Sequence, residues 1–352
     1  MQSFAQLDRL IGHVPARVVN QLRAIDAGRG SEAPHRNQLP GVLEDLARWA
    51  RVASVTASSE MEGIVVTDQV RAEQIIKGRG SVLRSRSERE LAGYRDALDY
   101  LSQSDWRPVN VGLLLHLHRL LFGRTNGAGG RFKEHDNVVV DRAADGSTTV
   151  RFRPVPAAQT EYAVAELVDR FRTAMAEDQH HPVLLIGLFA LDFSVIHPFE
   201  DGNGRVDRVM TNALLADAGH GVIRYISFEQ LIADSADAYY QSLLDSTHGW
   251  HDGKADPWPW LEYFGKTLAQ AYSQLEERAA TDRKPGAKQA RVRDYVLRRA
   301  PAGFRLADAR RALPGISAET IRMVLVQLRD EGVISVNGVG SAAFWVRRRV
   351  ES

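Results

Sequence analysis

Cysteine is absent from the sequence, and so is any apolar run long enough to cross a membrane. Without cysteine the chain can form no disulfide bond, no thiolate zinc site and no cysteine nucleophile. No stretch of about 18 or more apolar residues occurs, and the N-terminus lacks the basic and then apolar pattern of a secretion signal. These absences argue against a membrane partner and favour a cytoplasmic protein.

What is present is the composition of an ordinary globular protein. The chain has 352 residues, of which 44% are hydrophobic and 25% charged, and this suits a large core divided into two or three domains. The net charge of +1 hides an asymmetry, because residues 283–352 contain 15 Lys or Arg and only 6 Asp or Glu. The C-terminal end is therefore a separate, basic segment.

The segment 197–208 brings together the groups that a phosphate site needs. It follows an apolar helical run at 182–196 and precedes a second helical pattern that starts at Val206, which predicts a tight loop between two helices. Gly202 and Gly204 allow positive φ and the close approach of a ligand to the main chain. The amides that open the second helix then point at a bound anion.

Charged side chains complete this loop. Asp201 supplies a hard oxygen ligand suited to Mg2+, while Arg205 and Arg208, three residues apart, can grip phosphate oxygens from neighbouring positions of one helix face. His197 suits a general base near neutral pH. A Gly-Asn-Gly turn alone, or a histidine before proline alone, is more often structural. Their combination in one short segment favours an active site that handles phosphate.

The same segment resembles the signature of the Fic (Fido) family: histidine, proline, phenylalanine, two residues, Gly-Asn-Gly-Arg, two residues and arginine. The similarity extends over roughly residues 109–264. It implies a mainly α fold, with a Fic-type helical core and a β-hairpin flap. It also implies transfer of AMP from ATP, with Mg2+, to a Ser, Thr or Tyr hydroxyl of a target protein or of the protein itself.

The resemblance also implies a role for each residue of the motif. His197 would deprotonate the target hydroxyl, and Asp201 would hold Mg2+ between the phosphates. Arg208 would bind the γ-phosphate. The anion hole and the second phosphate arginine would be supplied by Gly202, Asn203, Gly204 and Arg205.

Residues 131–156 correspond to the flap of the family, and their own pattern predicts a hairpin. Residues 137–140 and 148–152 have the composition of strands, and Asp145-Gly146 is a turn signal between them. The resemblance implies that a target protein presents its hydroxyl along this hairpin, where an edge strand can recruit it by main-chain hydrogen bonds. Lys133 stands where many relatives have arginine, so a contact from that side chain is not carried over.

A second resemblance lies far upstream, in the segment 58–63. Ser58, Glu62 and Gly63 match the inhibitory motif of Fic proteins: serine or threonine, three residues, glutamate, then glycine or asparagine. A carboxylate placed beside the phosphate clamp would pair with Arg208 and exclude the γ-phosphate. The structural alternative is that Ser58 bonds near a helix end and Glu62 is solvated. Together with the downstream motif, inhibition is the favoured interpretation.

These patterns divide the chain into three predicted domains. Residues 1–105 form an N-terminal helical region that carries the inhibitory motif, and residues 106–282 form the Fic catalytic domain. In 283–352 the pattern predicts helices at 288–299, at 306–313 and after the N-cap Ser317, followed by strands at 333–336 and 343–346. This order resembles a winged helix-turn-helix.

The basic C-terminal domain makes DNA a candidate partner. Arg322 on the third helix is a candidate contact with DNA, and the segment 347–349, three consecutive arginines, could meet phosphates. The alternative is a protein-docking or dimer module, since winged helices serve all these purposes. Dimerisation of the whole protein is an expectation that only the resemblance supports.

Two classes of function remain open from the sequence. The first is a Mg2+-dependent protein adenylyltransferase held in check by Glu62. The second is a DNA-binding transcriptional regulator whose Fic domain senses ATP and is weakly active. Within the first class, use of another nucleotide or removal of AMP from the target remains an alternative, because the motif handles phosphates whatever flanks them.

Overall fold

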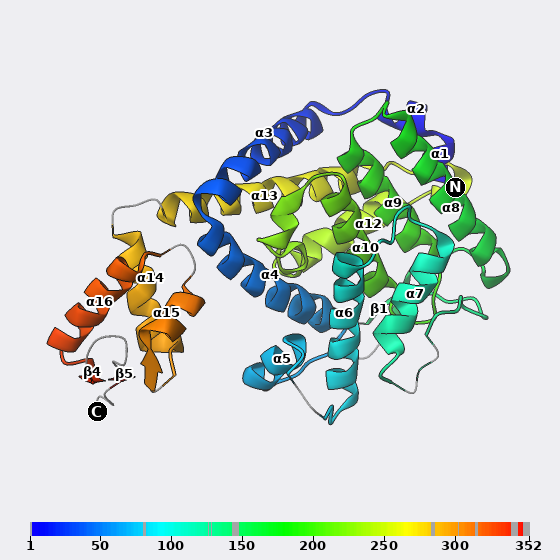
Figure 1. Cartoon of the computed structure of the whole chain (residues 1–352). Coiled ribbons are helices and arrows are strands. Elements are labelled where there is room, and N and C mark those ends of the chain that lie inside the picture. The colour runs from blue at the N-terminus through cyan, green and yellow to red at the C-terminus, as the bar shows by residue number, and fades with distance from the viewer. Residues whose placement is uncertain are drawn as a thin grey trace. The chain divides into compact units, whose positions relative to one another are not determined.

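The computed structural model describes residues 2–79, 82–125, 127, 129–142, 148–282, 286–301, 303–313, 316–338 and 344–347 (Figure 1). The fold is mainly α, as the sequence predicts. In the N-terminal part the helices are α1 (Gln2–Ala5), α2 (Leu7–Ile11), α3 (Ala16–Gln38), α4 (Pro40–Glu60), α5 (Gln69–Ile76) and α6 (Arg86–Gln103).

The middle of the chain contains the helices that surround the motif and one hairpin. These elements are α7 (Val111–Phe122), β1 (Val139–Arg142), β2 (Thr148–Phe152), α8 (Ala157–Glu177), α9 (Pro182–Ile196), α10 (Asn203–Asp217), α11 (Phe228–Ala233), α12 (Ala236–Thr247) and α13 (Trp258–Asp282). Two short 3-10 helices, η1 (Gly221–Arg224) and η2 (Trp250–Asp252), lie among them. None of the helices in the described ranges is both long and apolar enough to span a membrane.

The chain forms two compact units. The first contains Met1–Arg29 and Trp49–Tyr272, and the second contains Gly30–Arg48 and Ser273–Ser352. Helices α3, α4 and α13 each contribute residues to both units. The domain boundaries expected after residues 105 and 282 remain predictions.

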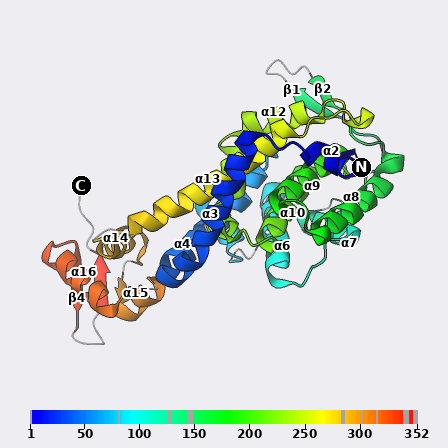
Figure 2. The ribbon, with the colours of Figure 1, turned by 90° about the horizontal axis from the view of Figure 1, so that it is seen from above.

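Helix α9 is the centre of the first unit. Its side chains are apolar except for Asp192 and Ser194, and all its residues but Pro182 and Ser194 are buried, as is typical of a helix enclosed by others. His181 is its N-cap, accepting a hydrogen bond from the Val183 amide, and Pro182 occupies the first turn, where a missing N–H costs nothing. Helices α8, α10 and α12 pack against α9, and the short α1 contacts both α8 and α9 (Figure 2).

Helix α10 begins at the motif itself. Gly202 is its N-cap with φ 85°, a conformation that favours glycine, and the helix starts at Asn203. Twelve of its fifteen residues are buried, because α6, α7 and α9 all pack against it. The motif loop is therefore fixed at both ends by enclosed helices, and this rigidity positions the side chains described below.

The predicted hairpin is confirmed. Strands β1 and β2 pair antiparallel, with Val140 opposite Val150 and an irregularity after Val139. The first strand begins two residues later than the sequence suggests, at Val139. The predicted Asp145-Gly146 turn lies outside the described residues.

The second unit contains α14 (Ala287–Asp294), α15 (Leu306–Ala312), α16 (Ala318–Asp330) and a three-stranded antiparallel sheet. The sheet order is β3 (Gly303–Arg305), β5 (Phe344–Arg347) and β4 (Ile334–Asn337). The predicted helices are present, and Ser317 caps α16 by accepting a hydrogen bond from the Thr320 amide. The first predicted helix needs a correction, because the α-helix ends at Asp294 and continues as a π-helical turn, η3 (Tyr295–Arg299).

Candidate active site

A pocket of about 440 Å3 opens on the motif loop. Four parts of the chain line it: Glu62 in the turn after α4, the hairpin, the motif with the end of α9, and α12. Of the residues that the sequence singled out, five face this pocket, whereas Asp201, Gly202 and Arg205 do not line it. The five are Glu62, His197, Asn203, Gly204 and Arg208.

His197 terminates α9 in a left-handed conformation, with φ 49°. This conformation is uncommon for residues other than glycine and is typical of strained functional positions. The ring Nδ1 lies 3.4 Å from the carbonyl oxygen of Ser194. A carbonyl only accepts, so Nδ1 carries the proton and Nε2 retains its lone pair. The strained turn therefore presents a basic nitrogen to the pocket.

The charge state of His197 follows from its surroundings. Burial lowers the pKa of the imidazole to about 4, and the nearby Lys133 ammonium acts in the same direction. A neutral imidazole is therefore present throughout the physiological range, and it is this form that accepts a proton.

The backbone of the motif loop is held by Asn203. Its side-chain oxygen accepts a hydrogen bond from the Phe199 amide at 2.8 Å, and its side-chain nitrogen donates to the Phe199 carbonyl at 2.8 Å. The Asn203 side chain is thus used within the loop. What the first turn of α10 can offer an anion is its main-chain N–H groups, which have no acceptor one turn earlier in the helix.

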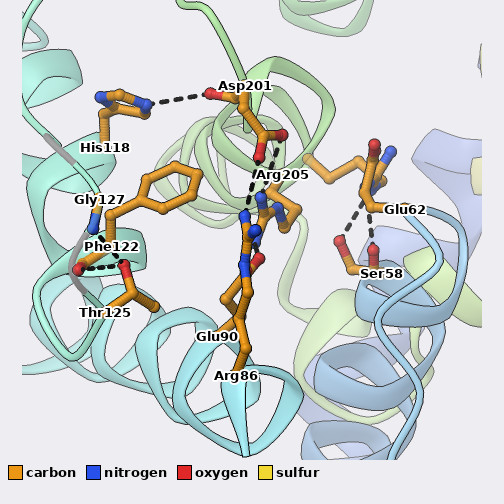
Figure 3. A network of polar contacts seen from close by, with 11 residues as sticks. Ser58, Glu62, Arg86, Glu90, His118, Phe122, Thr125, Gly127, Asp201 and Arg205 are labelled. Carbon is orange, nitrogen blue, oxygen red and sulfur yellow. Dashed lines mark hydrogen bonds and ion pairs between the residues drawn. The ribbon is translucent and has the colours of Figure 1, made fainter.

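Arg205 lies beneath the loop and is 1% exposed. Its guanidinium donates to Glu90 Oε2 at 2.7 Å and to Asp201 Oδ1 at 3.3 Å, and it sits 5.0 Å from the ring centre of Phe122 (Figure 3). A buried arginine needs such partners because an unpaired charge there is costly. In this geometry Arg205 ties α6 to the motif loop.

His118 was not singled out in the sequence, and it supports the other end of the loop. The Gly130 amide donates to its Nδ1 at 2.9 Å, so its Nε2 carries the proton and donates to the Asp201 carbonyl at 3.0 Å. Its ring stacks on Phe199 at 3.9 Å, and burial lowers its pKa to about 4. His118 is therefore a neutral structural group that fixes the position of Asp201.

Arg208 is bonded to the predicted inhibitory motif. Its Nε donates to the Ser58 hydroxyl at 2.8 Å, and its Nη2 donates to the Ser58 carbonyl at 3.1 Å and to Glu62 Oε1 at 2.7 Å (Figure 3 shows Ser58 and Glu62). A β-carbon placed on Gly204 would lie 2.4 Å from the same Glu62 oxygen. The absence of a side chain at Gly204 is what lets the carboxylate reach Arg208.

The Glu62 and Arg208 pair is ionised. Burial opposes the charge on Glu62, but Arg208 outweighs it, helped by Arg205, and the pKa of Glu62 is lowered. Burial alone would lower the pKa of Arg208. The opposing effect of Glu62, with smaller effects of Tyr239 and Tyr94, is stronger, so the pKa of Arg208 is raised. Glu62 therefore stays a carboxylate on Arg208 at neutral pH.

Asp201 is the candidate magnesium ligand. Its side chain is 55% exposed; Oδ1 is engaged by Arg205 at 3.3 Å, and Oδ2 lies 3.9 Å from Arg86 Nη2. No group of three or more metal-ligating side chains occurs among the described residues. That donor set fits Mg2+ and phosphate together, since this ion is usually held by one or two carboxylates, phosphate oxygens and water.

Lys133 is nearly inaccessible, with 3% of its surface exposed. Its ammonium donates to Asn137 Oδ1 at 2.9 Å and to the Ile196 carbonyl at 3.1 Å, and burial lowers its pKa to about 8. It therefore ties the approach to the hairpin to the end of α9. The sequence suggested only that an arginine is replaced here.

Sequence comparison matches residues 108–215 to the Fic/DOC family. The chain therefore contains a Fic domain. A protein adenylyltransferase Fic of Drosophila sechellia is 25% identical over 228 residues, which cover 62% of this chain and 43% of that protein. Its counterpart in Drosophila grimshawi is 30% identical over 137 residues, 37% of this chain and 26% of that protein. The chain thus spans less than half the length of these relatives.

Solved structures agree with the Fic fold. A Fic family protein from Desulfovibrio desulfuricans superposes with a TM-score of 0.63 at 21% identity, covering 97% of this chain and 98% of the other. A Fic domain containing signaling protein from Bacteroides thetaiotaomicron gives 0.59 at 19% identity, covering 75% and 97%. At these sequence identities the similarity establishes the fold alone, and the chemistry has to be inferred from the residues of the site.

Proposed function

We propose that the protein is a Mg2+-dependent adenylyltransferase that transfers AMP from ATP to a hydroxyl of a target protein or of itself, and that Glu62 inhibits it. The observation that carries the proposal is the arrangement around one pocket. His197 and the opening turn of α10 face it from one side, and Arg208 is covered by Glu62 at 2.7 Å. The similarity of this chain to the Drosophila protein adenylyltransferases supports the same reaction.

The pocket suits a nucleotide. Its lining includes Tyr240, Leu243 and Leu244 of α12 and Phe152 of the hairpin, and such apolar and aromatic side chains suit a base. The phosphates would then lie over the first turn of α10, where main-chain N–H groups and the helix dipole favour an anion. Arg208 would hold the γ-phosphate once Glu62 leaves it.

The chemical step follows from the tautomer of His197. Its Nε2 takes the proton of the target hydroxyl, and the oxygen forms a bond to the α-phosphorus of ATP. The bond from that phosphorus to the bridging oxygen breaks, and pyrophosphate leaves with its electron pair. Asp201 is the residue that would hold Mg2+, which when bound neutralises phosphate charge. Main-chain N–H groups of α10 stabilise the charge that develops on the α-phosphate.

Inhibition follows from competition for Arg208. The Glu62 carboxylate and a γ-phosphate are both anions that need the same guanidinium, so ATP binds in a productive position only when Glu62 is displaced. The partner would present its hydroxyl along the 131–156 hairpin. The three-domain division stays part of this proposal, with 1–105 carrying the inhibitor and 106–282 the catalytic site.

Incubation of the purified protein with labelled ATP and Mg2+ tests both parts of the proposal. We expect label on the protein itself, at least about tenfold stronger in Glu62→Gly than in wild type and absent in His197→Ala; tenfold corresponds to about 1.4 kcal/mol. Glu60→Gly is the matched control, since Glu60 is exposed at the end of α4, two residues before Glu62. Equal labelling of wild type and Glu62→Gly would refute the inhibitory role, and labelling of His197→Ala would refute the role of His197 as the base.

Parallel reactions with labelled GTP, CTP and UTP decide which nucleotide the enzyme uses. Release of AMP from a labelled target tests the alternative activity, removal of AMP.

A DNA-binding regulator remains the second candidate. What favours it is the exposed Arg322 on α16, in a unit that also contains α14, α15 and a three-stranded sheet, together with the basic charge of 283–352. In that case the Fic domain would act as an ATP sensor. The alternative for this unit, protein docking or homodimerisation, predicts no salt-dependent retention of DNA.

A further inference from the structure

A second pocket, of about 490 Å3, lies beside the motif loop and shares no lining residue with the first. Helix α6 contributes two arginines to its wall, and the segment after α7 contributes a third. The motif loop contributes two carboxylates, and α7 contributes His118 and Phe122. In Figure 3 the residues His118, Phe122 and Thr125 of this pocket lie on the opposite side of Arg205 from Ser58 and Glu62. The charged lining residues are Arg86, Arg89, Arg131, Glu200 and Asp201.

Arg89 is the most informative of these residues. It is partly buried, and its guanidinium makes no hydrogen bond or ion pair with any residue in the described part of the chain. A partly buried cation without a partner is unusual, because the charge loses water and gains nothing in return. An anionic ligand in the pocket would supply what it lacks.

The position of the two arginines on α6 also indicates a site for an anion. Arg86 and Arg89 lie among the first four residues of α6, three apart on one face of the helix. The N-terminal end of a helix is positive, so cations there are unfavourable and a bound anion is favourable. Arg86 has an ion pair with Glu90 at 2.5 Å, whereas Arg89 has none in the described structure.

The acidic residues of the pocket are already engaged. Glu200 Oε1 accepts hydrogen bonds from the main-chain N–H groups of Glu134 and His135, at 3.1 and 3.4 Å. Asp201 Oδ1 accepts from Arg205, and Asp201 Oδ2 lies 3.9 Å from Arg86 Nη2. Arg131 pairs with Glu134 at 3.1 Å, but both side chains are 63% exposed, and such surface pairs exchange easily. Arg89 and Arg131 are therefore available to a ligand.

We propose that this pocket binds a phosphate-bearing small molecule, held by Arg89 and Arg131. Its volume falls in the range of small-molecule sites, and the rings of Phe122 and Phe132 leave an apolar wall beside the arginines. Two sources share this chemistry: inorganic pyrophosphate, the expected product of adenylyl transfer, and a second nucleotide. The assignment stands on the pocket alone and does not depend on the proposed reaction.

Isothermal titration of the full-length protein with inorganic pyrophosphate tests the site. We expect the affinity for pyrophosphate to fall about tenfold or more in the double variant Arg89→Gln, Arg131→Gln, because its charge-assisted hydrogen bonds are lost. In Arg208→Gln the affinity should change less than about twofold, because Arg208 lines the first pocket. Arg170→Gln is the matched control, because Arg170 is exposed on α8, where it pairs with Glu166 and does not line the pocket. Thermal unfolding of each variant verifies that it is folded.

The contrary outcomes are distinct. Binding that survives in the double variant and disappears in Arg208→Gln places the anion in the first pocket and overturns the proposal, as does a wild-type protein that binds neither pyrophosphate nor a nucleotide in a way that depends on Arg89. Titration with ADP and AMP separates the two sources. A nucleotide that binds more tightly than pyrophosphate and depends on Arg89 identifies the second nucleotide, and the reverse order identifies pyrophosphate.

Discussion

At the scale of single residues, the proposed inhibition depends on the contacts of Arg208. The guanidinium is 4% exposed and bonds to both Ser58 and Glu62. Removing one member of such a buried pair leaves the other charge uncompensated, which is costly. In the proposed function a γ-phosphate supplies the replacement charge. On that proposal, exchange of one anion for another would keep the buried guanidinium paired in both the inhibited and the active state.

The pH dependence of labelling follows from the pKa of His197. Burial lowers that pKa to about 4, and the negative charge of Glu62 raises it slightly against this trend. In Glu62→Gly the pKa therefore falls further, and the fraction of neutral base is complete at any pH well above 4. We expect the labelling rate of Glu62→Gly to be flat between about pH 6 and 8 and to fall only below about pH 5. Initial rates measured across this range check it, and a tenfold fall centred near pH 6.5 would contradict it.

At the scale of elements, helix caps set where the site residues lie. Asn110 caps α7 by accepting a hydrogen bond from the Leu113 amide at 2.9 Å. The same helix carries His118, which donates to the Asp201 carbonyl. The motif loop is thus supported by a helix whose start is fixed by one side chain. Ser85 has the same role at the start of α6, where its hydroxyl accepts from the Glu88 amide at 3.1 Å.

Replacing the cap of α7 tests this dependence. We expect Asn110→Ala to lower the free energy of unfolding by about 1 kcal/mol, because an N-terminal amide loses its acceptor. Asn110→Asp is the matched control, since aspartate caps as well as asparagine and should stay within about 0.5 kcal/mol of wild type. Urea unfolding followed by circular dichroism measures both. Equal stability of the alanine and aspartate variants would show that this cap contributes nothing.

At the scale of the whole molecule, charge is segregated along the chain. Residues 283–352 have a net charge of +9, and the preceding 282 residues have −8. A field of this kind governs association with charged partners and does not determine the fold. Helix α4 has part of its length in each compact unit: Asp45 pairs with Arg291 at 2.7 Å in the second unit, and Ser58 bonds to Arg208 in the first.

Retention of DNA by the full-length protein tests the regulator hypothesis. If α16 enters the major groove, Arg322→Gln should weaken binding by about 1–3 kcal/mol or reduce the salt slope by about 1. Arg329→Gln is the matched control, because Arg329 lies near the end of the same helix and is paired with Asp330 at 2.6 Å. Gel retardation at several salt concentrations measures both variants. Absence of retention at low salt would leave protein docking as the role of this unit.

Much of the local structure was predictable. The end of α9, the hairpin strands and the Ser317 cap follow from periodicity and from residue types that act on near neighbours. Strand β3 was missed, because the three residues Gly303–Arg305 are too few to show an alternating pattern. The change from α-helix to π-helix after Asp294 likewise has no local signal.

Of the site, too, one part follows from the sequence and another part only from the tertiary structure. The sequence by itself determined the chemistry of the loop: a histidine, a carboxylate, two arginines and two glycines at fixed spacing. Tertiary structure decided which of them face the pocket, because contacts between distant segments determine burial and charge. Glu90, 115 positions from Arg205, draws that guanidinium beneath the loop, while Ser58, 150 positions from Arg208, holds the other one at the pocket. No local pattern encodes such pairs, so two arginines three residues apart acquire different surroundings only when the helices pack.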